Sequence, residues 1–279
     1  MSMLKDWKMN KKFLICIDSD GCAMDTMNIK HIQCFGPCLV KEWNLERWKE
    51  RILERWNEIN LYSMTRGINR FKGLALMLRE IDEKLTAVSG VDELINWVER
   101  SPELSNQSLR EEIKRTNYQI LNKALYWSDA VNHLIDSLPD NEKMPFKGVA
   151  ECLEKAYEFA DIAIVSSANE EAVTEEWKRC GLYRYTDLLL CQNAGNKTYC
   201  ISELKKKGYE KERILMIGDA PGDQVAAEKN GVLFYPVLVR QEAESWKELL
   251  HTGISIFKNG TYQSYGEEKK KAFIKNLKG

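Results

Sequence analysis

The sequence predicts an α/β protein with a mostly parallel sheet flanked by helices and an all-helical domain inserted after the first strand. Two observations support this prediction. From Pro145 onward, short apolar runs alternate with helical patterns, as expected for strands joined by helices in a parallel sheet. Between residues 23 and 145 the pattern is helical alone, and this block follows an apolar run at Phe13–Ile17.

The elements expected after Pro145 follow one another regularly. Helices are expected at 149–159, 170–179, 197–207 and 222–230, and strands at 161–166, 187–191, 213–218 and 232–239. The run at 13–17 is as apolar as these strands, so we expect it to join the same buried sheet. The sequence therefore predicts a Rossmann-like core domain of residues 1–22 and 146–279, interrupted by a helical domain of residues 23–145.

The inserted block carries apolar residues at helical spacing with charged residues between them. Such patterns run from Leu45 to Ile59 and through 71–81, 91–98 and roughly 109–138. Five of the eight tryptophans lie in this block: Trp43, Trp48, Trp56, Trp97 and Trp127. Large aromatic side chains dominate core burial, so we expect this stripe to form the core of the helical domain.

Composition restricts the classes of function. The 279 residues are 44% hydrophobic and 30% charged, with a formal net charge of −1, as in ordinary soluble proteins. This charge favours neither nucleic acid nor an acidic membrane as a partner. No apolar run approaches the roughly 18–20 residues that span a bilayer, and residues 1–12 lack the apolar stretch of a signal peptide. We expect a cytoplasmic monomer or homodimer whose eight cysteines are reduced.

The apolar run Phe13–Ile17 ends in two carboxylates and a glycine. Asp18 and Asp20 are two positions apart, so they lie on the same face of an extended chain, and Gly21 permits a sharp turn after them. Two acids this close repel each other unless a cation or a shared proton offsets the repulsion. The segment alone leaves two interpretations open, a metal-dependent site and an Asx turn at a strand end.

Two later strands also end in polar residues. The apolar run at 161–165 is followed by Ser166 and Ser167, and the strand expected before residue 219 is followed by Asp219 and Asp223. Taken singly, Ser166 can be an ordinary strand end, Ser167 can take its place, and the two acids can cap the helix behind them.

A lysine completes the series. Lys197 opens a helical pattern after the polar, glycine-containing loop 192–196, where a lysine by itself is most often a surface residue. The order along the chain is Asp-x-Asp-Gly, Ser, Lys and Gly-Asp-x-x-x-Asp. Together and in this order, the four motifs resemble those of the haloacid dehalogenase superfamily of phosphotransfer enzymes.

The resemblance implies a phosphatase that hydrolyses phosphate monoesters of a small phosphorylated metabolite. Asp18 would be the nucleophile that forms an aspartyl-phosphate, and Asp20 the general acid and base. Ser166 would donate a hydrogen bond to the phosphoryl oxygens, and Lys197 would supply positive charge. Keeping an acid at Asp20 points to phosphate esters, because dehalogenating and phosphonate-cleaving relatives lack it.

The resemblance also implies a Mg²⁺ cofactor at the carboxyl ends of the strands, where parallel sheets bind ligands. The expected ligands are the Asp18 carboxylate, the Asp20 backbone carbonyl and Asp219. Asp223 would support the metal or Lys197 from behind. Cys22 stands where Thr or Val is more usual, a departure that should leave the mechanism intact.

The helical insertion is implied to be a cap domain over the active site. Its segment 65–72 is a loop entering a helix and carries three cations, so Arg66, Asn69 and Arg70 are candidates for substrate contact, together with Ser167 of the core. A solvated helix start is the alternative for this segment.

Two other functions remain open: a sugar-phosphate mutase on the same scaffold, and a non-catalytic protein that binds phosphorylated metabolites. The segment after Gln241 matches no pattern.

Overall fold

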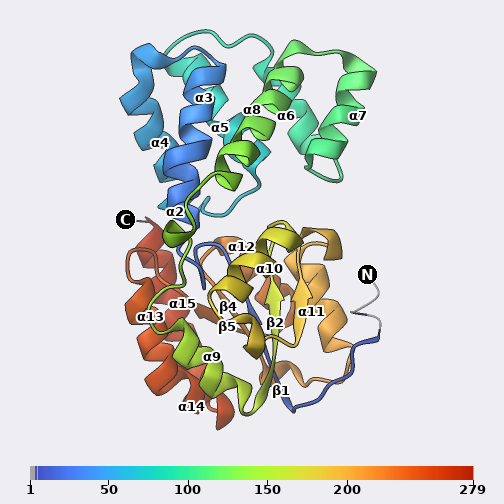
Figure 1. Cartoon of the computed structure of the whole chain (residues 1–279), viewed down its shortest axis with the longest axis vertical. Helices are drawn as coiled ribbons and strands as arrows, with labels where there is room; N and C mark the ends of the chain where they lie inside the picture. The colour runs from blue at the N-terminus through green and yellow to red at the C-terminus, as the bar shows by residue number, and fades with distance from the viewer. Residues whose placement is uncertain (1–3, 5, 279) are drawn as a thin grey trace. The chain divides into compact units, whose positions relative to one another are not determined.

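The computed structural model describes residue 4 and residues 6–278, and these form two compact units. Figure 1 shows their elements. The first, which we call the core unit, contains the chain up to Met27 and from Asp140 onward. The second, the insert unit, is Asn28–Pro139. The domain boundaries expected from the sequence lie at 22 and 146, a few residues from these limits.

Five strands of the described chain form one parallel sheet in the order β3-β2-β1-β4-β5. Their bounds are Phe13–Ile17 (β1), Ala160–Val165 (β2), Leu188–Leu190 (β3), Ile214–Gly218 (β4) and Leu233–Pro236 (β5). Every residue of β2 and of β4 is buried, as expected where helices cover both faces of a sheet. The predicted fold class is confirmed, with β1 as the central strand.

Helices connect and cover these strands. They are α9 (Val149–Tyr157), α10 (Glu170–Arg179), α11 (Lys197–Lys205), α12 (Pro221–Asn230) and the short 3₁₀ turns η3 (Asp140–Glu142), η4 (Tyr183–Tyr185), η5 (Gln192–Ala194) and η6 (Lys211–Arg213). Two of the helices begin with an asparagine cap: Asn169 accepts from the amides of Glu171 and Ala172, and Asn196 from that of Tyr199.

The segment after Gln241, for which the sequence predicted nothing, packs on the sheet. It forms α13 (Glu242–Glu248), the π-helical turn η7 (Leu249–Gly253), α14 (Ile254–Lys258) and α15 (Tyr262–Lys278). The Tyr262 hydroxyl donates to the Phe234 carbonyl of β5 at 3.0 Å, and Asn276 exchanges two hydrogen bonds with the backbone of Val239. These buried contacts make the C-terminal segment part of the core unit.

The insert unit is all helical. Its elements are α2 (Met27–Ile29, which starts one residue before the unit), the π-helical η1 (Lys30–Phe35), α3 (Gly36–Glu42), the 3₁₀ turn η2 (Glu46–Trp48), α4 (Lys49–Leu61), α5 (Arg70–Lys84), α6 (Val91–Arg100), α7 (Asn106–Thr116) and α8 (Gln119–Asp136). The predicted aromatic core is confirmed: Trp56 and Trp127 are fully buried with rings 5.9 Å apart, and only Trp48 of the five tryptophans is half-buried.

The helical pattern at 109–138 proves to be two helices. Asn117 ends α7 in the left-handed conformation, with φ at 55°, and α8 begins at Gln119. Asparagine tolerates this conformation better than most residues, so the chain turns there although the apolar spacing continues.

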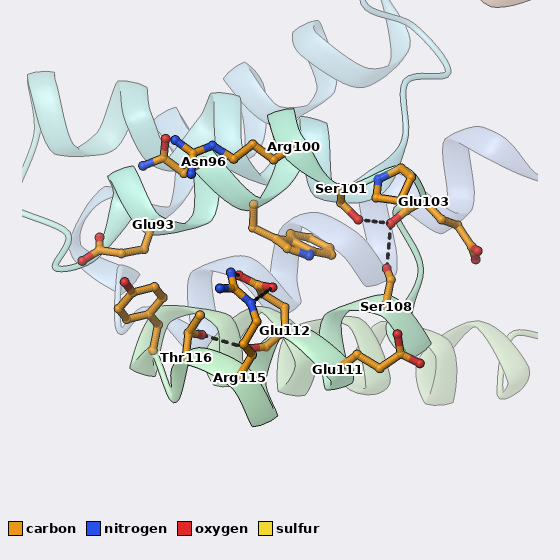
Figure 2. A pocket seen from close by; sticks show the side chains of 13 residues that line it. Glu93, Asn96, Arg100, Ser101, Glu103, Ser108, Glu111, Glu112, Arg115 and Thr116 are labelled. Carbon is orange, nitrogen blue, oxygen red and sulfur yellow. Dashed lines mark hydrogen bonds and ion pairs between the residues drawn. The ribbon is translucent and has the colours of Figure 1, made fainter.

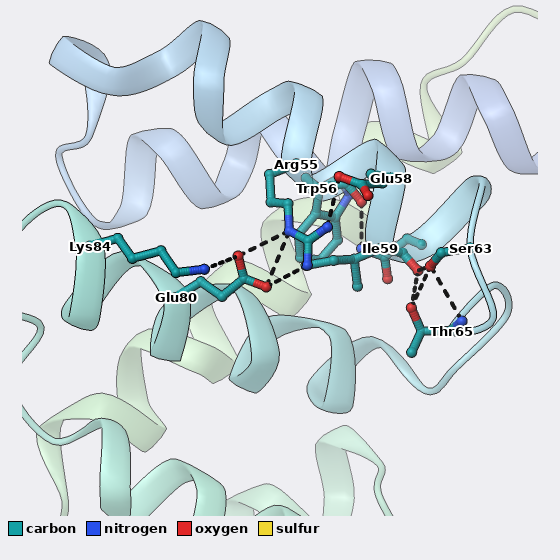
Figure 3. A network of polar contacts seen from close by, with 9 residues as sticks. Arg55, Trp56, Glu58, Ile59, Ser63, Thr65, Glu80 and Lys84 are labelled. Atoms are coloured by element: carbon teal, nitrogen blue, oxygen red, sulfur yellow. Dashed lines mark hydrogen bonds and ion pairs between the residues drawn. The ribbon is translucent and has the colours of Figure 1, made fainter. Parts of the chain in front are cut away.

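Polar contacts tie α4 to α5 on the surface of the insert unit, as Figure 3 shows. Arg55 of α4 pairs with Glu80 of α5 at 2.6 Å and with Glu58 at 2.7 Å, and Lys84 joins Glu80 at 3.3 Å. Arg55 is 37% exposed, so each of these pairs contributes about 1 kcal/mol or less.

None of the helices in the described part of the chain has both the length and the apolar character needed to cross a membrane.

Candidate functional site

The predicted site residues of the core unit follow three neighbouring strands. Asp18 follows β1, Ser166 follows β2 and Asp219 follows β4. Since these strands are adjacent and parallel, their carboxyl ends meet at the same edge of the sheet. The sheet therefore brings residues about two hundred positions apart to one edge.

Asp18 begins a tight loop. Its amide continues the ladder to the Ile217 carbonyl at 3.0 Å, and its Oδ1 accepts from the Ser19 amide at 2.8 Å. Gly21 has a φ of 80°, a conformation that glycine adopts without strain, and its amide donates to the Met24 carbonyl. The loop thus holds the carboxylate of Asp18 at the edge of the sheet, where the side chain is only 9% exposed.

The Asp20 side chain lies against a buried hydroxyl. Thr26 is fully buried, and its Oγ1 donates to Asp20 Oδ1 at 2.5 Å. Asp20 itself is half-buried and is not part of the carboxylate cluster that surrounds Asp18. The sequence did not single out Thr26, because one threonine six residues after an acid forms no pattern.

Asp223 lies in the first turn of α12 and is fully buried. Its Oδ2 accepts from the Ala220 amide at 3.1 Å, which is the capping role that the sequence left open, and its Oδ1 accepts from Lys197 Nζ at 2.6 Å. A β-carbon on Gly218 would lie 2.4 Å from the Asp223 side chain, so only glycine permits this close approach.

Lys197 joins the acids. It stands at the first position of α11, and its Nζ lies 2.8 Å from Asp18 Oδ2 and 2.6 Å from Asp223 Oδ1. The lysine side chain is 15% exposed. It therefore contacts the candidate nucleophile directly instead of lying on the protein surface.

The charges of these groups affect one another's pKa. Burial raises the pKa of Asp18 to about 8, with Lys197 opposing the rise and the charges of Asp223 and Asp219 adding to it. Burial lowers the pKa of Lys197, but the charges of Asp18 and Asp223 outweigh that effect and raise it. The lysine therefore stays protonated, but one ammonium does not offset all of these buried acids, and the raised pKa of Asp18 reflects an excess of negative charge that a proton or a cation must offset.

This excess suits a cation. One carboxylate oxygen from each of Asp18, Asp219 and Asp223 lies within 4.8 Å of the other two, and all three residues are buried. In the described part of the chain, this is the one group of acids, histidines or cysteines with such a geometry. Because all three ligands are hard oxygens, the donor set fits Mg²⁺ better than a softer transition metal.

The two serines after β2 differ. Ser166 is buried and its Oγ accepts from the Ala168 amide at 3.2 Å, while Ser167 is exposed. Both stand at the same sheet edge as Asp18, just before the capped start of α10.

The three substrate-contact candidates of the insert unit take part in its own structure. Arg66 is 2% exposed and donates to the Leu61 carbonyl at 2.8 Å. Asn69 caps α5 by accepting from the Phe71 amide at 2.9 Å, and its side-chain amide donates to the Leu104 carbonyl. The sequence had left a helix start open as the alternative, and Asn69 does take that role.

Arg70 is also engaged within the insert unit. It donates to Ser128 Oγ at 3.1 Å and to Asn132 Oδ1 at 2.6 Å, and its guanidinium lies 5.0 Å from the Phe35 ring centre. Burial lowers its pKa to about 10, against the opposing charge of Asp129.

A separate open cleft of about 680 Å³ lies between α6 and α7 of the insert unit (Figure 2). Trp97 and Tyr118 line it together with charged residues of both signs, and Arg115 is already paired with Glu112 at 2.5 Å. No residue that the sequence singled out for function lines this cleft.

Comparisons with known proteins identify the family. A model of the haloacid dehalogenase-like hydrolases matches residues 93–237, more than half of the chain. The match includes Ser166, Lys197, Asp219 and Asp223 and begins after Asp18. No curated protein matches the sequence.

Solved structures agree with the fold. A putative phosphoglycolate phosphatase from Lactobacillus delbrueckii superimposes with a TM-score of 0.52 at 14% identity over 86% of this chain and 98% of its own. A hydrolase from Pseudomonas syringae superimposes with a TM-score of 0.52 at 16% sequence identity, over 88% of this chain and 99% of its own. A haloacid dehalogenase-like hydrolase from Streptococcus pneumoniae has a TM-score of 0.50 at 12% sequence identity, over 84% of this chain and 90% of its own. The resemblance seen in the motifs is confirmed, and the chain belongs to the haloacid dehalogenase-like hydrolases.

Proposed function

We propose that the protein is a Mg²⁺-dependent phosphatase that hydrolyses a small phosphorylated metabolite through an aspartyl-phosphate on Asp18. The observation that supports this most is Lys197, whose Nζ bridges Asp18 and Asp223 inside a cluster of buried carboxylates. An ammonium group 2.8 Å from the attacking carboxylate offsets the repulsion that a phosphate dianion would meet there. The Lactobacillus protein of similar fold is named for a small phosphorylated substrate, which agrees with the proposed class.

In the first step, an Asp18 oxygen attacks phosphorus and the bond from phosphorus to the ester oxygen breaks. Both Asp18 oxygens are held, one by the Ser19 amide and one by Lys197, so the carboxylate is oriented before the substrate arrives. Asp20 donates its proton to the leaving oxygen. The buried Ser166 at the same sheet edge donates to a phosphoryl oxygen.

In the second step, Asp20 takes a proton from water, the water oxygen attacks phosphorus, and the bond to Asp18 breaks. Thr26, which donates to Asp20, would keep this acid turned toward the leaving oxygen and the water. Inorganic phosphate leaves, and Asp20 is again protonated for the next cycle.

The residues that would hold Mg²⁺ are Asp18, the Asp20 carbonyl and Asp219, with Asp223 supporting Lys197 through the ion pair at 2.6 Å. Bound there, the cation would neutralise negative charge on the phosphoryl group. Ser167 and the insert residues Arg66, Asn69 and Arg70 remain our candidates for substrate contact. In this proposal the enzyme acts in the cytoplasm, where its free thiols stay reduced.

A panel of phosphorylated metabolites incubated with Mg²⁺ tests the proposal, with phosphate release as the readout. The wild type should release phosphate from at least one compound without an activating bisphosphate, and Asp18→Asn should not. Release that requires a bisphosphate would favour the mutase. No release from any compound, with or without a bisphosphate, would contradict an enzymatic function on this class of substrate.

A further inference from the structure

The loop that presents Asp18 and Asp20, residues 18–24, is held together by one carbonyl oxygen. The Ser19 carbonyl accepts from the amides of Cys22 at 3.3 Å, Ala23 at 3.0 Å and Met24 at 2.8 Å. We call this segment the Asp18 loop. Its residues 19 and 22–24 are fully buried, so the loop is embedded in the core unit and not exposed to solvent.

A tryptophan donates to the residue between the two acids. Trp177 of α10 is fully buried, and its indole Nε1 donates to Ser19 Oγ at 2.9 Å. Hydrogen bonds are directional, whereas packing of apolar surfaces is not, so this contact defines the orientation of Ser19. Ser19 is bonded covalently to Asp18 and to Asp20, and its orientation therefore affects both.

A second tryptophan donates to the other side of the loop. Trp246 of α13 is fully buried, and its Nε1 donates to the Cys22 carbonyl at 2.9 Å. Trp246 lies in the C-terminal segment, beyond residue 237, where the family match ends. Gly148 lies beside Trp246: a β-carbon added to this glycine would be 3.4 Å from Trp246 Cβ.

We propose that Trp177 and Trp246 are positioning residues that hold the Asp18 loop from two helices. Their indole N–H groups bind the loop at Ser19, one residue before Asp20, and at Cys22, two residues after it. The C-terminal segment would thus take part in setting the geometry of the site, and not only in covering the sheet. The kinetic consequence rests on the proposed phosphatase function, because small displacements of a reacting carboxylate slow group transfer strongly.

The variants Trp177→Phe and Trp246→Phe remove the indole N–H and keep an aromatic side chain. Trp127→Phe is the matched control: Trp127 is fully buried in the insert unit and donates to the Phe35 carbonyl at 3.1 Å. All three changes delete one buried hydrogen bond, so they should cost similar stability. Only the first two should act on the Asp18 loop.

Two readouts separate positioning from stability. With a substrate found in the screen, Trp177→Phe and Trp246→Phe should lower kcat roughly tenfold with KM within about twofold of wild type, and Trp127→Phe should change neither. Amide hydrogen exchange of peptides covering 18–24 should speed up roughly three- to tenfold in the first two variants, relative to peptides elsewhere in the core unit.

Ser19→Ala tests whether Trp177 acts through the serine. If it does, Ser19→Ala combined with Trp177→Phe should be no slower than the worse single variant, because both remove the same contact. Additive losses in kcat would contradict this route.

Amide hydrogen exchange tests the positioning role of the tryptophans, and phosphate release tests the phosphatase function, so the two proposals can fail separately. If the wild type releases no phosphate, the function proposed above fails, and loop exchange still decides whether the tryptophans hold the loop. Unchanged loop exchange in both variants, or the same acceleration throughout the core unit, would overturn the positioning role.

Discussion

The candidate residues of the core unit and those of the insert unit behave differently. In the core unit, Asp18, Lys197 and Asp223 come from three distant segments, and Lys197 Nζ lies within 2.8 Å of a carboxylate oxygen of each acid. In the insert unit, Asn69 and Arg70 are neighbours in sequence, and their contacts are with backbone and side chains of that same unit. Convergence from distant segments marks the core cluster as the better-supported site, whereas a local group of cations does not mark a site by itself.

Two buried aspartates, Asp18 directly after β1 and Asp161 in the adjacent β2, give the strongest test of this contrast. Asp161, at the amino end of β2, accepts from the amides of Asn10 and Lys11 and from the Tyr209 hydroxyl. Asp18→Asn should lower kcat by about 10⁴-fold or more, because it removes the proposed nucleophile. Asp161→Asn should leave kcat within about twofold and lower the free energy of unfolding by about 1–3 kcal/mol.

Steady-state kinetics and urea unfolding of both variants check these values. The assignment of Asp18 as nucleophile would be wrong if the two substitutions reduced kcat equally.

Removing the central lysine should affect both activity and folding. Lys197→Met leaves the carboxylates of Asp18 and Asp223 buried without their cation, so the metal-free protein should lose about 3–5 kcal/mol of unfolding free energy. Asp18→Asn in the same chain should restore part of this loss, because one of the two unpaired charges is gone. Thermal unfolding in EDTA measures the wild type and the two variants, and equal stability of wild type and Lys197→Met would argue against the ion pairs.

Arg70 allows the matching test in the insert unit. Arg70→Ala deletes hydrogen bonds to Ser128 and Asn132, so we expect a loss of about 1–3 kcal/mol in unfolding free energy. A structural role alone predicts an unchanged KM in the folded variant, whereas substrate contact predicts a raised KM. Arg70→Lys serves as the control, since it keeps the charge but not the geometry of the guanidinium.

The smallest expected effect compares one buried thiol from each unit. Burial raises the pKa of Cys34 in the insert unit and of Cys200 in the core unit to about 11. Each group is therefore protonated when folded and ionised when unfolded between pH 9 and 11, so its contribution to stability falls as the pH rises through that range.

Alkylation at pH 9 followed by peptide mass spectrometry reads both thiols at once. The labelled fraction of each thiol is followed as the urea concentration rises. If Cys34 and Cys200 become labelled at the same urea concentration, the units unfold together; if one becomes labelled at a lower concentration, they unfold separately. Rapid labelling of either thiol in the native protein would contradict its burial.

Much of the core could be predicted from the sequence because local patterns carry the information. The strands β1 and β4 are continuous apolar runs, β2 is apolar after Asp161, and polar residues follow all three; such runs are typical of strands buried on both faces of a parallel sheet. In a parallel sheet, the carboxyl ends of adjacent strands meet at one edge, so the sequence alone predicts that Asp18, Ser166 and Asp219 lie at the same edge. The break at Asn117 was missed because apolar spacing continues across it, and one residue's backbone conformation decides the turn.

The sequence by itself determined which residues are candidates for the chemistry, since strand ends and short motifs are local features. Only the tertiary structure decided which groups support them: Thr26 beside Asp20, Trp177 on Ser19, and Trp246 from a C-terminal segment that matched no pattern. The physical reason is that a buried indole N–H can donate to whichever acceptor the packing brings near it. Its partner depends on how the helices pack on the sheet, which no local pattern encodes.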